Sequence, residues 1–431
     1  MKELFRNKSY TLLFTGSLVS EMGNVIFGFV AGLYVQDITD GKPIILALFM
    51  ALGAFVRLLF SPVAGVLVDR LDKVKIIYLT DFFRGLLFVA VAYVFFIGVD
   101  TNSAIIILLS VTVVSGIISS FFGPAVAAAT PEIVGLDKIQ QANGANSIIQ
   151  SSTMIVGVIL GAAAFGLFPF HIALLINGVS FLLSGISETF IKSIHKGELP
   201  EHEAPHMIRD IKFGFNYLKQ KDGLLRMMVY MLFLNFAFAP MFSVGIPFLL
   251  RTELSRNEWE IAWVNIAFGI AMMIAGVVVG NMAFKSIATV VKKTLLGLSS
   301  SFVYTSLIIF LLSAGVIEYQ LFYILLIVAH VLLAIFMIAT NIPLNTSLVK
   351  IINPEVRGRV FSTISAISGG AVPIAILLGG VVIQMSNVAF LGIVSALLLL
   401  VPTYGFMTDK KVRGLLEGIE GEVNGQLQET I

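Results

Sequence analysis

The chain contains no cysteine and few charged residues. Of its 431 residues, 13% are charged and 57% are hydrophobic, and the mean hydropathy is +0.95. A typical soluble domain has roughly 25% charged and 45–50% apolar residues, so this composition indicates a polytopic membrane protein. The absence of cysteine excludes disulfides and metals bound by thiolates.

Motifs for nucleotide binding and for serine hydrolysis are also missing. The sequence has no G-x-x-x-x-G-K-[ST] loop, no G-x-G-x-x-G and no G-x-S-x-G, and it has no polar region large enough for an ATPase domain. Three histidines in the polar interval, His195, His202 and His206, are interpreted as part of a solvated loop. We therefore expect no enzyme activity, no metal and no cofactor, with transport energy drawn from an ion gradient or from the substrate's own gradient.

Long apolar stretches dominate the sequence. A helix needs about 20 apolar residues to cross a bilayer, and the first stretch is long enough to remain as a membrane span. Together the stretches predict an all-α membrane protein with twelve transmembrane helices in two pseudo-symmetric six-helix halves. The spans are expected near 9–36, 43–68, 76–98, 103–123, 142–166, 170–191, 224–250, 260–283, 294–315, 320–348, 360–384 and 388–407.

Lysine and arginine are distributed very unevenly between the predicted loops. With both termini in the cytoplasm, all but five of the 28 basic residues fall in cytoplasmic segments. The exceptions are Lys42, Arg251 and Arg256 outside, and Arg57 and Arg84 within spans. Because cytoplasmic loops are enriched in Lys and Arg, this distribution favours a bacterial plasma membrane protein with both termini inside.

One polar interval, from Lys192 to Asp222, separates six spans from six. It includes MIRDIKFGFNYLKQKDG, where Ile208, Ile211, Phe215 and Leu218 share one helical face. The predicted domains are an N-terminal bundle over 1–192, a cytoplasmic linker with an amphipathic helix over 193–222, a C-terminal bundle over 223–408 and a cytoplasmic tail over 409–431. Paired six-helix halves are typical of transporters with a site near the bilayer midplane.

A charged loop follows the second span and has a degenerate second copy. It reads GVLVDRLDKVKI from Gly65, and GVVVGNMAFKSIATVVKK begins at Gly276 in the second half. The glycine spacing is kept, but Gly280 and Asn281 stand where the first copy has Asp69 and Arg70. This internal repeat supports duplication of a six-span unit.

The first copy resembles the signature of the major facilitator superfamily, G-x-x-x-D-R-x-G-[RK]-[RK]. Gly65, Asp69, Arg70 and Lys73 fit this signature, whereas Asp72 replaces its glycine and a valine replaces one basic residue. FFGPAVAAATPEIVGLDKIQQANG after the fourth span and NPEVRGRVFSTISAISGGAVP before the eleventh add to the likeness. The chain resembles the branch that holds macrolide efflux pumps and siderophore exporters.

The resemblance implies that the charged loop is a cytoplasmic latch. Asp69 would approach the N-terminus of the eleventh helix, near Gly358 to Phe361, where unsatisfied N–H groups and the helix dipole favour an anion. Gly65 would permit close helix approach, and the basic residues would bridge to carboxylates. In the alternative, Arg70, Lys73 and Lys75 only set the topology, which leaves the aspartate unexplained.

Asp81 and Arg84 lie at i and i+3 in the third span. They either belong to the same latch or form a local ion pair.

Glu21 and Arg57 lie inside predicted spans at comparable depths. At 1.5 Å per residue, Glu21 is about 18 Å from the inner end of the first span and Arg57 about 21 Å from the outer end of the second. Charged residues at such depths are costly and are functional candidates by default. Glu21 either takes up a proton or binds a cationic substrate, or it forms a permanent ion pair with Arg57.

The superfamily resemblance implies a central cavity lined by spans one, four, seven and ten. Its polar candidates are Glu21, Asn24, Ser115, Ser119, Asn235, His330 and Asn341. His330 either titrates near neutral pH or is a hydrogen-bonded structural residue, and the last two asparagines could equally join helices.

The fifth span departs from the family pattern. Drug–proton antiporters usually carry a Gly-Pro pair there, but this span reads STMIVGVILGAAAFG without proline. The sequence predicts a secondary active exporter of a hydrophobic or amphipathic small molecule, working by alternating access with proton antiport. Uniport and lipid flipping stay open, and the alternative substrate is a lysophospholipid or siderophore. The expected partners are the substrate, protons and membrane lipids, without nucleic acid, and the expected state is a monomer.

Overall fold

The described part of the protein contains helices joined by turns and no strands. A computed structural model describes residues 4–135, 138–192, 207–282, 286–353 and 356–415. Twelve of its helical segments are long and apolar enough to cross a membrane, at the twelve places that the sequence predicts. The predicted fold class, an all-α membrane protein with twelve spans, is confirmed.

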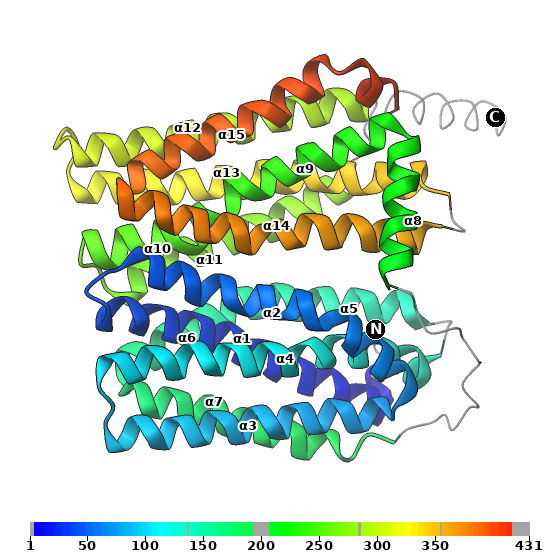
Figure 1. The fold of residues 1–431 in the computed structure, drawn as a ribbon, viewed down its shortest axis with the longest axis vertical. Helices are drawn as coiled ribbons and strands as arrows, with labels where there is room; N and C mark the ends of the chain where they lie inside the picture. The colour runs from blue at the N-terminus through cyan, green and yellow to red at the C-terminus, as the bar shows by residue number, and fades with distance from the viewer. Residues whose placement is uncertain (1–3, 136–137, 193–206, 283–285, 354–355, 416–431) are drawn as a thin grey trace. The chain divides into compact units, whose positions relative to one another are not determined.

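The chain divides into two compact units, which are described separately. Unit 1 comprises Met1–Pro205 together with Leu250–Ala262, and unit 2 comprises His206–Leu249 and Trp263–Ile431. The helices of unit 1 (Figure 1) are α1 Lys8–Ile38, α2 Pro43–Arg70, α3 Lys73–Ile97, α4 Thr101–Val134, α5 Ile139–Ser152, the π-helix η3 Thr153–Gly157, α6 Val158–Leu167 and α7 Phe170–Glu188.

Unit 2 contains the spans of the second half and one surface helix. Its elements are α8 Met207–Gln220, α9 Asp222–Pro240, the π-helix η4 Met241–Gly245, α10 Ile246–Phe248, α12 Ile287–Ser313, α13 Tyr319–Ile351, α14 Arg357–Met385 and α15 Val388–Thr408. The π-helix η5 Leu249–Glu253 and α11 Glu258–Gly280 cross from one unit into the other.

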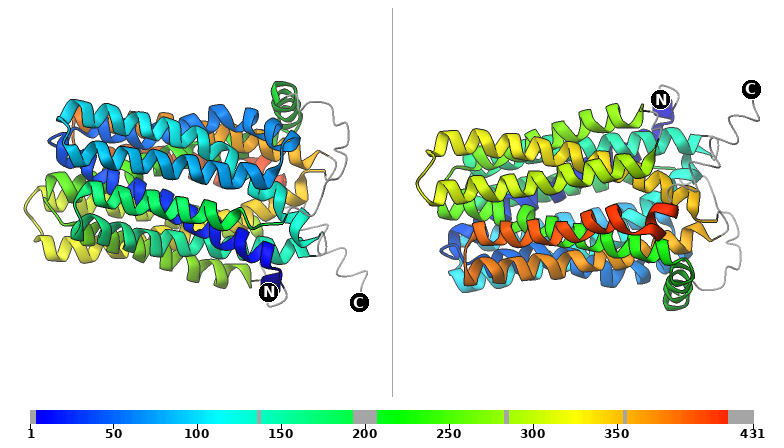
Figure 2. Two further views of the ribbon diagram at one scale, coloured as in Figure 1. Left: turned by 90° about the horizontal axis from the view of Figure 1, so that it is seen from below. Right: turned by 90° about the horizontal axis from the view of Figure 1, so that it is seen from above.

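The amphipathic helix α8 packs on α14 and α9 of unit 2 (Figures 1 and 2). Leu218 is fully buried in this contact, and Gly214 lies so close to Thr363 that a side chain there would collide with it. By its contacts α8 is part of unit 2, whereas the rest of the predicted linker, 193–206, lies outside the described residues.

Five helices, α1, α3, α4, α12 and α15, begin at a short polar residue whose side chain accepts a hydrogen bond from an N–H group of the first turn, since these N–H groups have no intrahelical partner. Asp72, which replaces the glycine of the charged signature, is the N-cap of α3, and its carboxylate accepts a hydrogen bond of 3.1 Å from the backbone N–H of Lys75. Asp100 caps α4 in the same way. The departure from the family signature therefore has a local structural reason.

Removal of the Asp72 cap is expected to destabilise the protein modestly. Asp72→Ala should cost about 1 kcal/mol, whereas Asp72→Gly should cost only a few tenths, because glycine is itself a tolerated N-cap. Unfolding of the purified protein in detergent with increasing denaturant would measure both values. Equal losses for the two variants would contradict the capping role.

The fifth span is interrupted by a π-helix instead of a proline. Thr153–Gly157 continues α5 into α6, and the Thr153 hydroxyl donates to the carbonyl oxygen of Ile149 at 2.9 Å. A Cβ added to Gly157 would lie 2.9 Å from the Val25 side chain, so α1 passes close to this point. π-Helical turns inside α-helices often mark functional positions.

Helices α3 and α7 of unit 1 are packed backbone against backbone. A Cβ added to Gly178 would lie 2.9 Å from the backbone nitrogen of Val89, and one added to Gly85 would lie 2.9 Å from that of Leu182. Small residues allow this close approach within a membrane.

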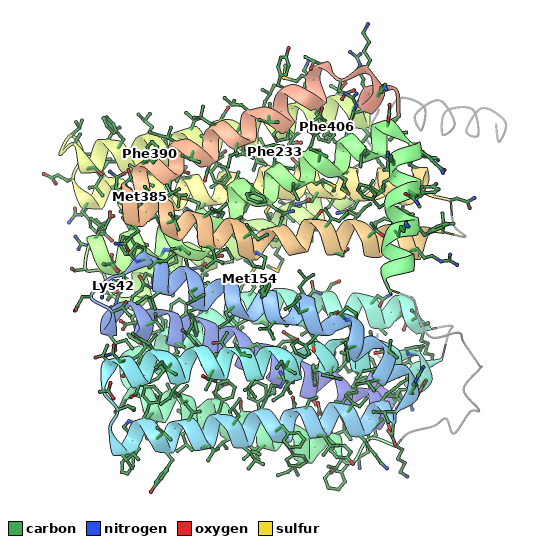
Figure 3. The ribbon with its side chains drawn as sticks, viewed as in Figure 1. Lys42, Met154, Phe233, Met385, Phe390 and Phe406 are labelled. Carbon is green, nitrogen blue, oxygen red and sulfur yellow. The ribbon has the colours of Figure 1, made fainter. Side chains whose placement is uncertain are left out.

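The surfaces of the helices carry exposed apolar side chains, such as Met385 and Phe390 (Figure 3), as expected for helices that contact lipid.

Candidate functional site

Unit 1 contains a cavity of about 680 Å³ between α1, α4 and α5. This volume is within the range of about 300–1,000 Å³ found for small-molecule sites. Its lining is partly apolar, with Phe14, Phe122 and Val126, and partly polar, with Ser17, Asn143, Asn146 and Gln150. Thr153, the first residue of the π-helix, also lines it, so the irregular turn of the fifth span borders the cavity.

Among the described residues, Glu21 is the only carboxylate that lines this cavity. Its side chain is exposed, and the amide nitrogen of Asn24 donates a long hydrogen bond of 3.5 Å to its Oε2. No ion pair joins Glu21 to Arg57, whose side chain is exposed, in the part of the chain that the structure describes. Of the two alternatives for Glu21, the ion pair with Arg57 is therefore not found here, because equal depth does not place two residues on facing sides of their helices.

The other predicted cavity residues are found in different surroundings. Ser115 is buried and Ser119 half-buried on α4, and neither lines this cavity. Asn235, half-buried on α9, donates to the carbonyl oxygen of Met231 at 3.1 Å, and Asn341 is half-buried on α13. The chemistry of the cavity in unit 1 therefore depends on Glu21 and its polar neighbours.

His330 is a buried residue of unit 2. Its Nδ1 lies 2.8 Å from the carbonyl oxygen of Leu326, one turn earlier on α13, and the ring of Phe242 packs edge-on at 5.2 Å between centroids. Of the two alternatives for His330, this environment favours the hydrogen-bonded structural residue.

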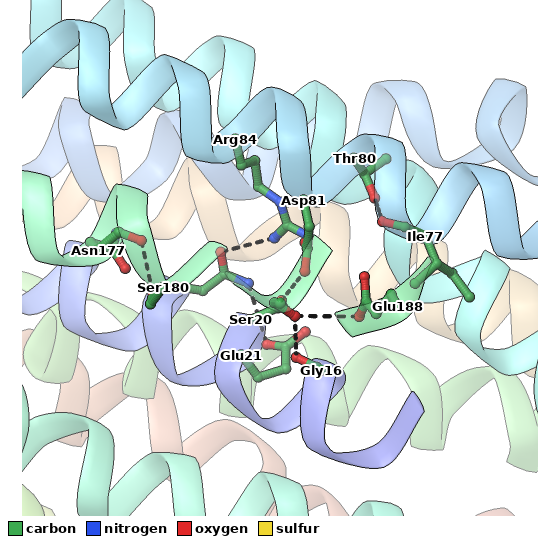
Figure 4. Close-up of polar contacts among 12 residues, drawn as sticks. Gly16, Ser20, Glu21, Ile77, Thr80, Asp81, Arg84, Asn177, Ser180 and Glu188 are labelled. Atoms are coloured by element: carbon green, nitrogen blue, oxygen red, sulfur yellow. Dashed lines mark hydrogen bonds and ion pairs between the residues drawn. The ribbon is translucent and has the colours of Figure 1, made fainter. Parts of the chain in front are cut away.

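A buried group of charged side chains lies between α1, α3 and α7 (Figure 4). Asp81 and Arg84 are both fully buried, and their side chains form an ion pair of 2.5 Å. The second oxygen of Asp81 accepts a hydrogen bond from the Ser20 hydroxyl on α1. Of the two alternatives for this pair, the structure shows the local ion pair, and it adds a partner from a second helix.

Arg84 also joins this buried group to the cavity. Its guanidinium lies between the rings of Phe122 and Phe181, 4.7 Å from each centroid, a favourable arrangement for a desolvated cation. One terminal nitrogen lies 3.4 Å from the side-chain oxygen of Asn24, whose amide in turn faces Glu21. Phe122 is also part of the cavity lining.

Glu188, at the end of α7, completes the buried group. It is fully buried, and its Oε1 lies 3.4 Å from the hydroxyl of Ser184. That hydroxyl is also 3.3 Å from the Ser20 hydroxyl and 3.2 Å from the carbonyl oxygen of Gly16. The sequence interpretation missed Glu188 because it lies at the edge of the sixth span; the available signal was an acidic residue in the otherwise uncharged FLLSGISETF.

The charged signature, which covers the end of α2 and the start of α3, is only partly described. Lys73 forms an ion pair of 2.8 Å with Glu132 near the end of α4, and Arg70 is exposed. A Cβ on Gly65 would meet nothing within 4 Å, so the close approach predicted there is not present within the described residues of unit 1. The side chain of Asp69 lies outside the described residues, and its role stays a prediction.

The π-helix η5 contacts the end of α1 within unit 1. Arg251 donates to both carboxylate oxygens of Asp37, at 2.8 and 2.7 Å. A second acid, Glu258, has its Oε2 3.9 Å from Nη1 of Arg251. Thr252 contacts the Gln36 side chain at 3.3 Å. The sequence interpretation used Arg251 only for topology, because an ion pair between residues 214 positions apart leaves no local pattern.

His202 and His206 frame a match to H-E-x-x-H, but Pro205 lies inside it, which disfavours the helix that this metal motif requires, and the segment lies outside the described residues. Among the described residues, no cluster of three or more His, Asp or Glu side chains could hold a metal ion.

A family model described as Major Facilitator Superfamily matches residues 13–375. The chain belongs to the major facilitator superfamily. Its members are transporters and not enzymes, and the chain is a multi-pass bacterial membrane protein. Superfamily members of known sequence and structure support the same assignment.

Two relatives in this superfamily illustrate the level of similarity. Macrolide efflux protein A of Streptococcus pyogenes is 24% identical over 379 residues, 86% of this chain and 88% of that protein. The putative bacilysin exporter BacE of Bacillus subtilis is 29% identical over 243 residues, 54% of this chain and 56% of that protein.

Solved superfamily structures share the fold. A bacterial homologue of the iron transporter ferroportin, crystallised in its inward-facing state, has a TM-score of 0.73 at 16% identity and covers 94% of this chain and 98% of its own. The nucleoside transporter NupG has a TM-score of 0.67 at 13% identity, with 93% of this chain and 98% of its own covered. At these identities the likeness shows the fold alone.

Proposed function

We propose that the protein is a secondary active exporter of a hydrophobic or amphipathic small molecule, driven by proton antiport. The observation that carries the proposal is the cavity of unit 1, in which Glu21, the one carboxylate among the described lining residues, faces aromatic, aliphatic and amide side chains. Such a lining suits a bulky molecule with a cationic or hydrogen-bonding group. The likeness to Macrolide efflux protein A over most of the chain supports export of a drug-like substrate.

Glu21 gives this cavity a simple exchange mechanism. A carboxylate at this depth is stabilised when its charge is neutralised, either by a proton or by a cationic substrate. The two compete for the same oxygens, so binding of one favours release of the other. Alternating access of the two halves then couples outward movement of substrate to inward movement of protons.

The membrane placement follows from the basic residues. Lysine and arginine are concentrated in loops on one side, so we place both termini in the cytoplasm and the protein in the plasma membrane. The protein would work as a monomer with lipids around it, without cofactor or nucleic acid. Lys42, Arg251 and Arg256 then lie on the outer side, together with the Arg251–Asp37 contact.

The Arg251–Asp37 contact is proposed to act as an outer latch. The segment Leu250–Ala262 packs in unit 1, but the chain on both sides of it belongs to unit 2. If the adjoining chain moves during the cycle, it would pull on the contacts of this segment with Asp37 and Gln36, and we propose that these contacts then open and re-form. A bidentate Arg–carboxylate pair gives such a contact defined geometry.

Replacement of Glu21 tests the antiport proposal. Uptake of labelled macrolides, cationic dyes, siderophores and lysolipids into inverted vesicles would be measured with and without an imposed proton gradient. Wild type should show gradient-dependent uptake of at least one amphipathic compound, and Glu21→Gln should lose it because a neutral amide exchanges no proton. Glu318→Gln, on an exposed residue at the start of α13, is the matched control.

Two outcomes would contradict the proposal. Full gradient dependence in Glu21→Gln would remove Glu21 from the coupling mechanism. Uptake of lysolipids or siderophores alone, whether or not a gradient is imposed, would favour the alternative substrate classes and facilitated movement.

A further inference from the structure

The buried group in unit 1 contains more carboxyl groups than cations. Asp81, Arg84 and Glu188 are all fully buried, and close backbone packing of α3 against α7 surrounds them. Two carboxylates and one guanidinium would leave one uncompensated negative charge. Burial of an unpaired charge is so costly that such a group is normally neutral, so the question is which carboxyl carries the proton.

The hydrogen bonds of Asp81 are those of an ionised carboxylate. One oxygen accepts from Arg84 at 2.5 Å, and the other accepts from the Ser20 hydroxyl. Both of its oxygens therefore face strong donors. The single cation of the group is used by Asp81, because the other terminal nitrogen of Arg84 faces Asn24.

Glu188 has the surroundings of a neutral acid. Its Oε2 has no hydrogen-bond partner within the described residues, and the donor to its Oε1 is the Ser184 hydroxyl, at a long 3.4 Å. A buried carboxylate with one long contact would be poorly solvated. A protonated Glu188 can instead donate to Ser184, which then donates its own proton to the carbonyl oxygen of Gly16 at 3.2 Å.

We propose that Glu188 is a second proton-binding site of this protein in addition to Glu21, buried between α1, α3 and α7. Its proton has a path of hydroxyl groups to Asp81: Ser184 contacts Glu188, Ser20 contacts Asp81, and the oxygens of the two hydroxyls are 3.3 Å apart. For transfer, the Ser184 hydroxyl turns its proton from Gly16 to Ser20. When each hydroxyl then accepts one proton and passes on its own, Glu188 becomes a carboxylate and Asp81 an acid, with no change in total charge.

The groups that face Glu188 define what controls this site. From α3 they are Asp81 and Arg84, from α1 the hydroxyl of Ser20 and the backbone of Gly16, and α6 has no ionisable residue. Hydrogen bonds connect Glu21 to Asn24 and Asn24 to Arg84, so a change of charge at Glu21 can act on the buried group. The part of this inference that concerns coupling to transport depends on the proposed function, whereas protonation of Glu188 does not.

Infrared spectroscopy of the purified, reconstituted full chain tests the protonation directly. The carbonyl band of a protonated carboxylic acid should be present in wild type near neutral pH and lost in Glu188→Gln. Glu318→Gln, which changes an exposed carboxyl group, should keep it. An unchanged band in Glu188→Gln would overturn the proposal.

Stability of the same variant gives an independent answer. Glutamine resembles protonated glutamic acid in size and charge, so Glu188→Gln should melt within about 2 °C of wild type, a shift that corresponds to a change of less than about 1 kcal/mol. A variant that fails to fold or melts much earlier would show that an ionised Glu188 is needed, and would overturn the proposal.

Transport separates this inference from the proposed function. Gradient-stimulated uptake should fall at least tenfold in Glu188→Gln, while binding of the substrate in the absence of a gradient is retained. Retention of full gradient stimulation would reject the coupling role. If wild type shows no gradient-dependent uptake, the antiport proposal fails, and the infrared band still decides the protonation of Glu188.

Discussion

Asp81→Asn is expected to destabilise the protein by about 3–5 kcal/mol, the typical cost of removing one partner of a buried ion pair. Arg84 is fully buried and cannot lose its proton, so the variant retains a desolvated cation between two phenylalanine rings without its counter-ion. Unfolding in detergent, followed by circular dichroism, and the yield of folded protein would measure the loss.

A matched control is available in the same unit. The Lys73–Glu132 pair is partly exposed, at 15% and 32% of the two side chains, so Lys73→Met should cost about 1 kcal/mol or less. If Asp81→Asn costs no more than Lys73→Met, the buried pair does not hold α1, α3 and α7 together as described.

Glu188 should determine how much stability the Asp81→Asn variant loses. In Asp81→Asn it is the remaining acid beside Arg84 in the buried group, and it can partly replace the lost charge by releasing its proton. Adding Glu188→Gln removes this compensation, so the double variant should be less stable than Asp81→Asn alone. Equal stabilities would show that Glu188 does not respond to the charge of Arg84.

The twelve spans could be predicted from sequence because apolar length is a local property. Each span consists of about 20 consecutive, mostly apolar residues, and the structure has its helices at those places. The Asp81–Arg84 pair was also within reach, since residues at i and i+3 are neighbours on one helix. The sequence could not decide between this ion pair and the latch, because that choice depends on which face of α3 is buried.

The partners of these residues could not be predicted because they come from other helices. Depth along a span gives no information about the direction of a side chain around the helix axis, which is why equal depth could not decide whether Glu21 and Arg57 pair. Asp37 and Arg251 meet across 214 positions of sequence, and Glu188 lies close to α1 only because glycines let the helices approach closely. Such contacts are properties of packing.

The proposed outer latch predicts that a reversible cross-link abolishes transport. A Cβ added to Gly41 would lie 3.2 Å from the Cβ of Thr252. The Cβ atoms of a disulfide are about 3.5–4.5 Å apart, so a small backbone shift is enough for Gly41→Cys/Thr252→Cys to form a disulfide on oxidation. The natural chain has no cysteine, so these two thiols are the only pair that can react.

Oxidation should remove transport almost completely, and a reducing agent should restore it. The reason is that the disulfide fixes Leu250–Ala262 to the α1–α2 corner, while the adjoining chain must move with unit 2 during alternating access. Each single cysteine variant serves as a control, and Gly41→Cys also measures the strain of a side chain at φ +70°. Undiminished transport in the fully cross-linked protein would show that this contact stays closed throughout the cycle and belongs to the static core of unit 1.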